Sequence, residues 1–240
     1  MQLLKSLASN LPRRYQQELK RLYFARLIRK RLFQRAIEDE PEFNRLDQWV
    51  KPGDWVLDIG ANVGNYSARL SELVQDAGRV LALEPVPETF ELLAANVGRF
   101  PIGNVTLFNV AASDRFAVRG MQMPSLDSGG SNPYMAHLTA DGAGISVLCV
   151  PVDSLGIAHT IRLIKIDVEG HELAAVRGMR ELLQRDRPVL IIEGQSGEVA
   201  AFLSELGYSF AQDAGSPNRV FTPANGSDGV ATISSVTRHS

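Results

Sequence analysis

The sequence predicts an α/β protein with one doubly wound, mostly parallel sheet and helices on both of its faces. Short apolar runs typical of buried strands alternate from Trp55 onwards with segments that have a helical period. Several of these runs end at a glycine or an acidic residue, where a strand gives way to a turn. With 240 residues, of which 45% are hydrophobic and 22% charged, the chain is long enough for one full-sized domain.

The expected elements follow one another in a regular order. Strands are predicted at 55–59, 80–84, 105–110, 145–150, 161–167 and 188–193, with two short ones near Tyr208 and Val220. Helices are predicted at about 65–74, 88–97, 171–184 and 198–206. The segment 114–144 has no clear period, so we expect a long loop, which in a compact domain is either functional or disordered.

Basic residues concentrate near the N-terminus. Between Met1 and Arg35 ten basic residues accompany one acidic residue, Glu18, which gives this segment a charge of +9 and leaves −11 for the rest. We expect a helix here that packs on the domain and turns its arginines to solvent. The alternative is a basic amphipathic helix that contacts an anionic membrane or a partner. The predicted organisation is a basic helical extension at 1–47, an α/β domain at 48–222 and a flexible tail at 223–240.

Composition argues against several classes of protein and site. The single cysteine, Cys149, excludes an internal disulfide and a cysteine-rich metal site, which fits a reducing compartment. The four histidines lack the spacing of zinc ligands. No segment has the pattern of a transmembrane helix or a signal peptide, and the acidic body would repel nucleic acid. We therefore expect a cytoplasmic protein that binds no nucleic acid.

The most informative motif is a strand that breaks into a glycine-bearing turn, D-I-G-A-N-V-G at 58–64. Gly60 and Gly64 allow the backbone to approach a ligand closely and to turn into the next helix. The next strand ends at Glu84, where dinucleotide-binding folds place an acid that binds the ribose hydroxyls of an adenosine. These features predict an adenosine-containing cofactor.

The glycine spacing distinguishes between two such cofactors. A nicotinamide or flavin site requires G-x-G-x-x-G, and the close second glycine is missing here. Asp58 would also repel a pyrophosphate beside the turn, whereas a carboxylate suits the cationic end of S-adenosylmethionine. The sequence therefore favours S-adenosylmethionine over a nicotinamide-dependent oxidoreductase. A non-catalytic module that keeps the cofactor pocket remains an alternative.

A second motif, K-I-D-V-E-G-H-E at 165–172, follows a later strand. Four expected strands end in carboxylates, and the carboxyl ends of parallel strands meet at the edge of the sheet where ligands bind. These carboxylates are Asp58, Glu84, Asp167 and Glu193. Asp167, Glu169 and Glu193 could offer oxygen ligands to magnesium, but capping and ion-pair roles explain them as well, and we expect no metal.

The two motifs, together with L-E-P-V-P at 83–87 and R-G-M at 177–179, resemble the FkbM-type S-adenosylmethionine-dependent methyltransferases. The resemblance spans roughly Trp55 to Glu193. It implies the class I methyltransferase sheet of seven strands, the last of them antiparallel. It also implies methyl transfer, mostly to hydroxyls of sugars, lipids or natural products. The segments 128–131 and 152–155 resemble the middle region of that family.

The resemblance also implies roles for particular residues. It implies that four residues contact the methionine and ribose parts of the cofactor: Asp58, Gly60, Asn62 and Gly64. Glu84 would bind the ribose diol. The segment from Asn109 to Ala111 would bind the adenine, and Asp167 would lie near the transferred methyl.

A hydroxyl acceptor must lose its proton, and the candidates for the general base are Asp167, Glu169 and His171. At the first turn of a helix the charged form of His171 is disfavoured, so it could accept a proton. The alternative is that His171 faces solvent or caps the helix. The acceptor itself cannot be read from the sequence. We expect its choice to depend on 116–144, with Tyr134 and His137 as the side chains of interest.

Overall fold

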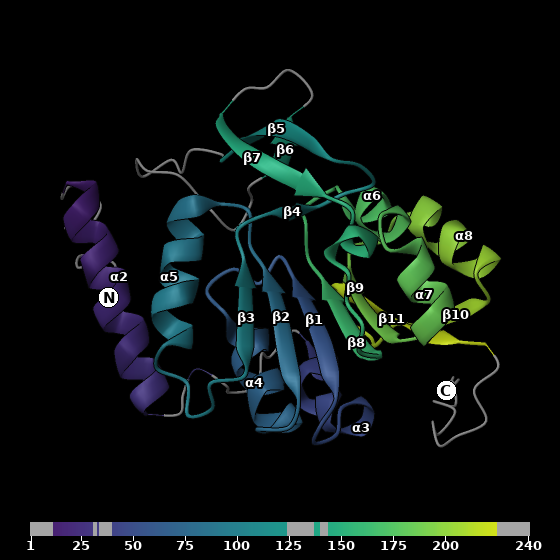
Figure 1. Cartoon of the computed structure of the whole chain (residues 1–240), viewed down its shortest axis with the longest axis horizontal. Helices are drawn as coiled ribbons and strands as arrows, with labels where there is room; N and C mark the ends of the chain where they lie inside the picture. Colours follow the sequence, from purple (N-terminus) through teal and green to yellow (C-terminus); the bar gives the residue numbers. More distant parts are fainter. Residues whose placement is uncertain (1–11, 31–32, 34–39, 124–136, 140–143, 225–240) are drawn as a thin grey trace, which may run out of the picture.

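The computed structural model describes residues 12–30, 33, 40–123, 137–139 and 144–224. In this part of the chain there are two sheets, a larger one of seven strands and a smaller one of four. Figure 1 shows the larger sheet at the centre, helices beside it, and the smaller sheet above the ends of its parallel strands. The predicted segment 128–131, Tyr134 and the tail at 225–240 lie outside the described residues.

The larger sheet has the strand order β10-β11-β9-β8-β1-β2-β3. Its pairs are parallel, except that β11 runs antiparallel to both of its neighbours, β9 and β10. The prediction of a doubly wound, mostly parallel, seven-stranded sheet with an antiparallel last strand is confirmed. Its strands are β1 (Trp55–Ile59), β2 (Arg79–Leu83), β3 (Val105–Phe108), β8 (Ile161–Ile166), β9 (Val189–Glu193), β10 (Tyr208–Ala211) and β11 (Asn218–Pro223).

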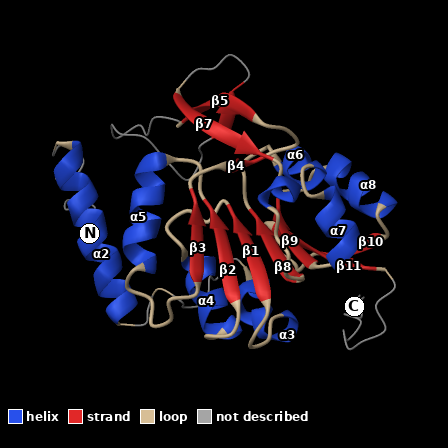
Figure 2. Cartoon of the chain, in the orientation of Figure 1, coloured by secondary structure: helices blue, strands red, loops and turns tan. Residues whose placement is uncertain are grey.

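Helices cover both faces of this sheet (Figure 2). Because side chains alternate along a strand, Leu57 and Ile59 face a core formed with the helices that follow β8 and β9, while Val56 faces the helices near the start of the domain. Phe43 and Leu46, within the predicted extension, are buried in that second core. The helices are α2 (Arg13–Arg29), η1 (Pro41–Arg45), α3 (Leu46–Trp49), α4 (Asn65–Val74), α5 (Pro87–Val97), η3 (Val152–Leu155), α6 (Glu172–Arg177), α7 (Arg180–Asp186) and α8 (Gly197–Glu205).

The predicted helix at 171–184 is two helices, so that prediction was wrong. α6 ends at Arg177, with Gly178 as its C-cap, and α7 begins at Arg180. A Cβ on Gly178 would lie 1.8 Å from the carbonyl oxygen of Ser113, so the helix meets another backbone here and breaks. Asp153 then accepts hydrogen bonds from the Glu181 and Leu182 N–H groups at 3.0 and 2.9 Å, which caps the new helix.

The prediction of one long loop at 114–144 was also wrong for its described part. Two strands from this segment join the smaller sheet, whose order is β4-β7-β5-β6. Its inner side carries a small apolar core that includes Met121, Val147 and Cys149, so pairing and burial form strands where no period was visible. The strands are β4 (Ala111–Ala112), β5 (Ala117–Gln122), β6 (His137–Thr139) and β7 (Ile145–Val150).

The basic helix α2 lies along α5, on the outside of the domain (Figure 1). Phe24, Leu27 and Ile28 turn inward and pack in a cluster with Leu92. Arg21 bridges the two helices through Glu91, at 3.3 Å. No helix in the described part of the chain has both the length and the apolar character needed to cross a bilayer.

Candidate active site

The turn between β1 and α4 has a backbone that most residues adopt only with strain. Gly60, Asn62 and Gly64 have φ angles of 77°, 52° and 97°. A Cβ on Gly60 would lie 1.8 Å from the carbonyl oxygen of Asp167. The Asp167 N–H in turn donates to the Ile59 carbonyl at 3.0 Å. The turn therefore brings the two sequence motifs into direct contact, and this contact requires glycine at position 60.

A hollow of about 60 Å³ lies at the carboxyl ends of the central strands. Seven of the ten residues predicted for the site line it: Gly60, Asn62, Glu84, Ala111, Asp167, Glu169 and His171. The structure adds Ile59, Pro85, Val86, Val110, Ala112, Met121, Leu138 and Val168. Most of these additions are apolar, and the sequence held no signal that separates them from ordinary core residues.

The smaller sheet forms one side of this hollow. Met121 from β5 and Leu138 from β6 line it, together with Gly60 and Asp167, which follow the carboxyl ends of β1 and β8 in the larger sheet. Ligand pockets usually measure about 300–1,000 Å³. The hollow is smaller than this range.

Glu84 presents a fixed and deeply buried carboxylate. One oxygen accepts from the Asn62 N–H at 3.0 Å and the other from the Val86 N–H at 2.9 Å. The residue is 5% exposed, and burial raises the pKa of its carboxyl to about 7 against the effect of both hydrogen bonds. Each oxygen keeps a further acceptor position, so the group can bind a pair of ligand hydroxyls.

Asn62 leaves a polar atom without a partner at the same place. Its side-chain oxygen is buried and has no hydrogen bond within the described structure. Such an atom costs free energy unless something satisfies it. Because Asn62 also lines the hollow, a donor group on a ligand would satisfy this atom.

Asp58 lies beneath the turn and does not line the hollow. It is 1% exposed and accepts a hydrogen bond from the Ser67 hydroxyl at 2.5 Å. Burial raises the pKa of Asp58 to about 6. Across the pair with β8 it is opposite the buried Lys165, whose ammonium donates to the Asn218 side chain at 2.9 Å. Asp58 therefore ties the strand to the first turn of α4.

Gly64 and Asn109, also predicted to bind cofactor, have supporting positions. Gly64 precedes α4, and a Cβ there would lie 2.8 Å from the Leu93 side chain. The Asn109 amide donates to the carbonyl oxygens of Glu84 and Pro85, at 2.8 and 3.1 Å. Neither residue lines the hollow, and both hold the backbone that does.

His171 is half-buried at the start of α6 and lines the hollow. Its Nε2 lies 3.0 Å from the Ser113 hydroxyl, which fixes the ring. Burial, with a smaller effect from the Arg119 cation, lowers the pKa of His171 below its usual value. The imidazole is therefore neutral near pH 7 and able to accept a proton.

The remaining carboxylates gather as predicted at the strand ends. Glu169 has a φ of 39° and lines the hollow together with Asp167, and burial raises the pKa of Glu169. Burial and a hydrogen bond with Asp167 raise the pKa of Glu193 to about 7. Within the described residues, no group of three or more His, Cys, Asp or Glu side chains is arranged to hold a metal ion.

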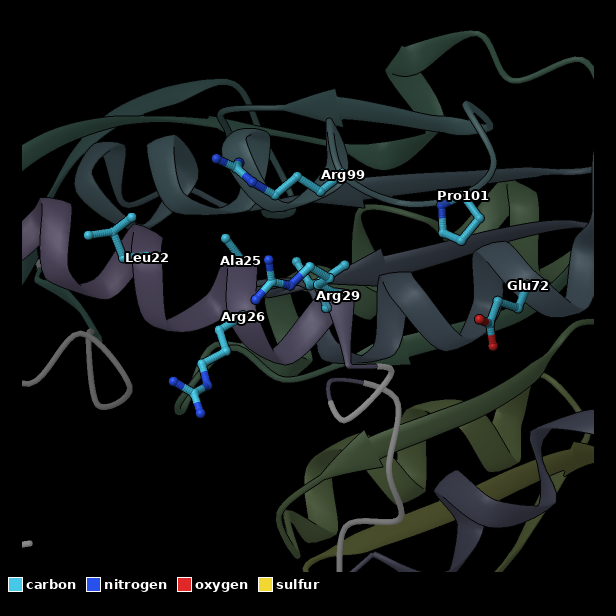
Figure 3. A pocket seen from close by; sticks show the side chains of 8 residues that line it. Leu22, Ala25, Arg26, Arg29, Glu72, Arg99 and Pro101 are labelled. Carbon is cyan, nitrogen blue, oxygen red and sulfur yellow. The ribbon is translucent and has the colours of Figure 1, made fainter.

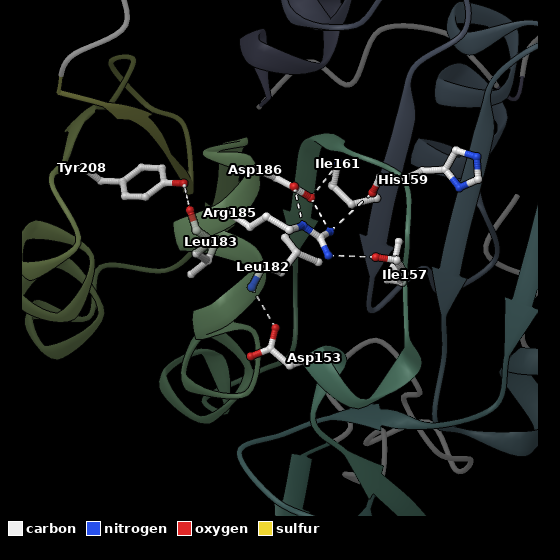
Figure 4. Close-up of polar contacts among 9 residues, drawn as sticks. All are labelled: Asp153, Ile157, His159, Ile161, Leu182, Leu183, Arg185, Asp186 and Tyr208. Carbon is white, nitrogen blue, oxygen red and sulfur yellow. Dashed lines mark hydrogen bonds and ion pairs between the residues drawn. The ribbon is translucent and has the colours of Figure 1, made fainter.

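Polar contacts at the start of β8 hold the strand that leads to Asp167 (Figure 4). Asp186 accepts from the Ile161 N–H at 2.9 Å, where β8 begins, and pairs with Arg185 at 2.7 Å. Arg185 also donates to the Ile157 carbonyl at 3.0 Å. These contacts connect α7 to the start of β8 and fix the strand's position.

The comparisons with known proteins bear on this arrangement. The family model for the methyltransferase FkbM domain matches residues 58–210, a range that includes both motifs and the hollow. The chain belongs to this family. Membership makes S-adenosylmethionine its cofactor and excludes the nicotinamide-dependent alternative.

Two curated relatives and one solved structure illustrate the similarity of this FkbM methyltransferase. The hexuronic acid methyltransferase AglP of Haloferax volcanii is 28% identical over 159 residues, which are 63% of this chain and 62% of AglP. The 31-O-demethyl-FK506 methyltransferase FkbM of Streptomyces tacrolimicus is 30% identical over 196 residues, 67% of this chain and 74% of the relative. A methyltransferase FkbM from Methylobacillus flagellatus KT shares the fold, with a TM-score of 0.51 and 16% identity over 87% of this chain and 59% of that one.

Proposed function

We propose that this FkbM methyltransferase transfers the methyl group to a hydroxyl of a sugar, lipid or natural product. The observation that carries the proposal is the set of three proton acceptors beside one another in the hollow: Asp167, Glu169 and His171. AglP acts on a hexuronic acid, and the Streptomyces relative on a demethylated FK506, which supports acceptors of this kind.

The residues around the hollow suit S-adenosylmethionine. We assign the ribose hydroxyls to Glu84, because its two oxygens are fixed and keep acceptor positions. The unsatisfied oxygen of Asn62 suits a donor on the same ligand. Val86, Ala111 and Met121 offer an apolar wall for the adenine. Asp58, Gly64 and Asn109 act by holding this framework.

When bound, S-adenosylmethionine supplies a methyl group on a sulfonium, which is an activated leaving group. The protein must then hold the acceptor oxygen in line with that methyl, and such positioning contributes about 7–11 kcal/mol in favourable cases. Met121 and Leu138 exclude water from one side of the hollow. Neutral His171, in the tautomer whose Nε2–H donates to the Ser113 hydroxyl, takes the acceptor's proton at Nδ1, and Asp167 orients the acceptor.

The test is methyl transfer from labelled S-adenosylmethionine to a panel of sugar, lipid and polyketide hydroxyls. Transfer that depends on His171, and product analysis that finds the label on oxygen, is the expected result. Label on nitrogen would contradict O-methylation. Cofactor binding without transfer to any acceptor would favour the non-catalytic alternative. The cytoplasmic location stays a prediction.

We also propose that α2 contacts an anionic membrane surface. Leu19, Leu22 and Tyr23 point away from the domain and are 46%, 61% and 60% exposed. Leu22 also lines a hollow of about 610 Å³, whose charged lining residues are three arginines and one carboxylate: Arg26, Arg29, Arg99 and Glu72 (Figure 3). It lies far from the site of chemistry. Exposed apolar side chains beside arginines match the boundary of an anionic bilayer, where both kinds of group are accommodated.

A further inference from the structure

One charged side chain stands on the otherwise apolar inner side of the smaller sheet. Alternation along β5 puts Arg119 on the same side as Ala117 and Met121, which belong to the small core. Its neighbour across the pair with β7 is the buried Val147. Arg119 is the only charged residue in β5 and β7.

The guanidinium of Arg119 lacks a partner in the part of the chain that the structure describes. Arg115, four residues earlier, pairs with Asp114 at 3.0 Å, so that nearby carboxylate is already taken. Arg119 itself is half-buried. A guanidinium without a counter-ion in the described structure is free to pair with a bound anion.

Arg119 does not itself line the catalytic hollow, but it lies on the side of β5 from which a neighbour reaches it. Met121, two residues further along the same side of β5, lines the hollow. His171 lines it as well, and the Arg119 charge adds to the effect of burial in lowering the pKa of His171. The cation therefore stands close to the group that we assign as the proton acceptor.

An acidic acceptor needs a cation in or beside this hollow, because the hollow itself is lined by carboxylates. Glu84, Asp167 and Glu169 all line the hollow, and their carboxylates repel an acidic molecule. We propose that Arg119 binds an anionic group, a carboxylate or a phosphate, on the acceptor whose hydroxyl is methylated. A guanidinium binds either group through two parallel hydrogen bonds. This inference rests on the proposed function.

The experiment compares three methyl glycosides that differ in charge: methyl glucuronoside, methyl glucoside and the 6-phosphate of methyl glucoside. Binding of each is titrated into the protein with S-adenosylhomocysteine present, and methyl transfer is measured in parallel. The variants are Arg119→Gln, Arg119→Lys and the control Arg162→Gln, which removes an exposed charge at the opposite end of β8.

We expect the wild type to bind at least one acidic glycoside, and Arg119→Gln to weaken that binding about tenfold to a hundredfold. Affinity for S-adenosylmethionine and for the neutral glycoside stays within about twofold, and Arg119→Lys keeps part of the binding. Preference for the glucuronoside identifies a carboxylate as the anion, and preference for the phosphate ester identifies a phosphate.

Equal loss of acidic and neutral glycosides, a loss confined to the cofactor, or binding of neither acidic glycoside by the wild type would overturn the inference. Failure of the proposed function would give a different experimental result. In that case the acidic glycoside binds in an Arg119-dependent way, yet no acceptor is methylated.

Discussion

Gly60 and Asp167 meet so closely that a methyl group on Gly60 would lie 1.8 Å from the Asp167 carbonyl oxygen. The two residues directly follow neighbouring strands, β1 and β8, which pair in parallel. Their contact sets the distance between the proposed cofactor turn and the proposed acceptor-side motif. The site therefore depends on a backbone approach that side chains cannot replace.

Gly60→Ala tests this contact through stability. We expect a loss of about 1–2 kcal/mol from the left-handed backbone and about 1–3 kcal/mol more from overlap with Asp167. Gly53→Ala is the matched control, since its φ is 92° and no atom lies within 4 Å of the added Cβ. Denaturant unfolding measures both. Equal losses in the two variants would refute a specific contact.

Glu84→Gln tests the ribose assignment. The variant keeps the shape but loses the charge and one acceptor, so we expect affinity for S-adenosylmethionine to fall about tenfold to a hundredfold. Calorimetric titration measures it, with Glu91→Gln on the outer side of α5 as control. Unchanged affinity in a folded Glu84→Gln protein would remove Glu84 from the cofactor site.

The same carboxylate makes stability depend on pH. The pKa of Glu84 rises on folding from 4.5 to about 7, so the folded state holds the proton more tightly. The stabilisation from this bound proton is complete below the pKa of the unfolded chain. It is lost as the pH rises through the pKa of the folded state. We expect the free energy of unfolding without cofactor to fall between pH 4.5 and 8, by up to about 3 kcal/mol from this group.

Unfolding midpoints at pH 5 and pH 8, at constant ionic strength, measure this slope. Asp58, whose pKa rises to about 6, contributes in the same direction. Glu84→Gln removes one titrating group and should flatten the slope. A wild-type protein that is more stable at pH 8 than at pH 5 would contradict the prediction.

His171→Gln tests the proton acceptor. We expect kcat to fall about a hundredfold to ten-thousandfold, with the limb of the pH profile below pH 6.5 removed. Ser113→Ala releases the ring and should cost about tenfold. The control is His159→Gln, because His159 stacks on Trp55 with ring centroids 3.9 Å apart, outside the hollow. If His171→Gln keeps the acidic limb, Asp167 or Glu169 is the base.

Sedimentation with vesicles tests the membrane contact of α2. We expect binding to vesicles that contain phosphatidylserine, none to phosphatidylcholine alone, and release by salt. Leu22→Glu with Tyr23→Glu should abolish binding, while Phe210→Glu, on β10 and 47% exposed, should not. Binding that survives the double variant would show that another surface is responsible.

The sequence predicted the larger sheet well because its central strands are buried and read as apolar runs. In the smaller sheet it predicted β7 at 145–150 but missed β5 and β6, since β5 buries only one side and shows no clear period. It also missed the break between α6 and α7, because the cause is the Ser113 backbone rather than any residue of those helices.

By itself the sequence determined the fold class, the glycine-bearing turn after β1 and the carboxylates at the strand ends, because local pattern and spacing decide these. Only the tertiary structure decided which residues face the hollow. Asp58 lies beneath the turn, whereas Met121 and Leu138 reach the hollow from a second sheet. Such contacts depend on packing between distant segments, and no period in the sequence records where two sheets meet.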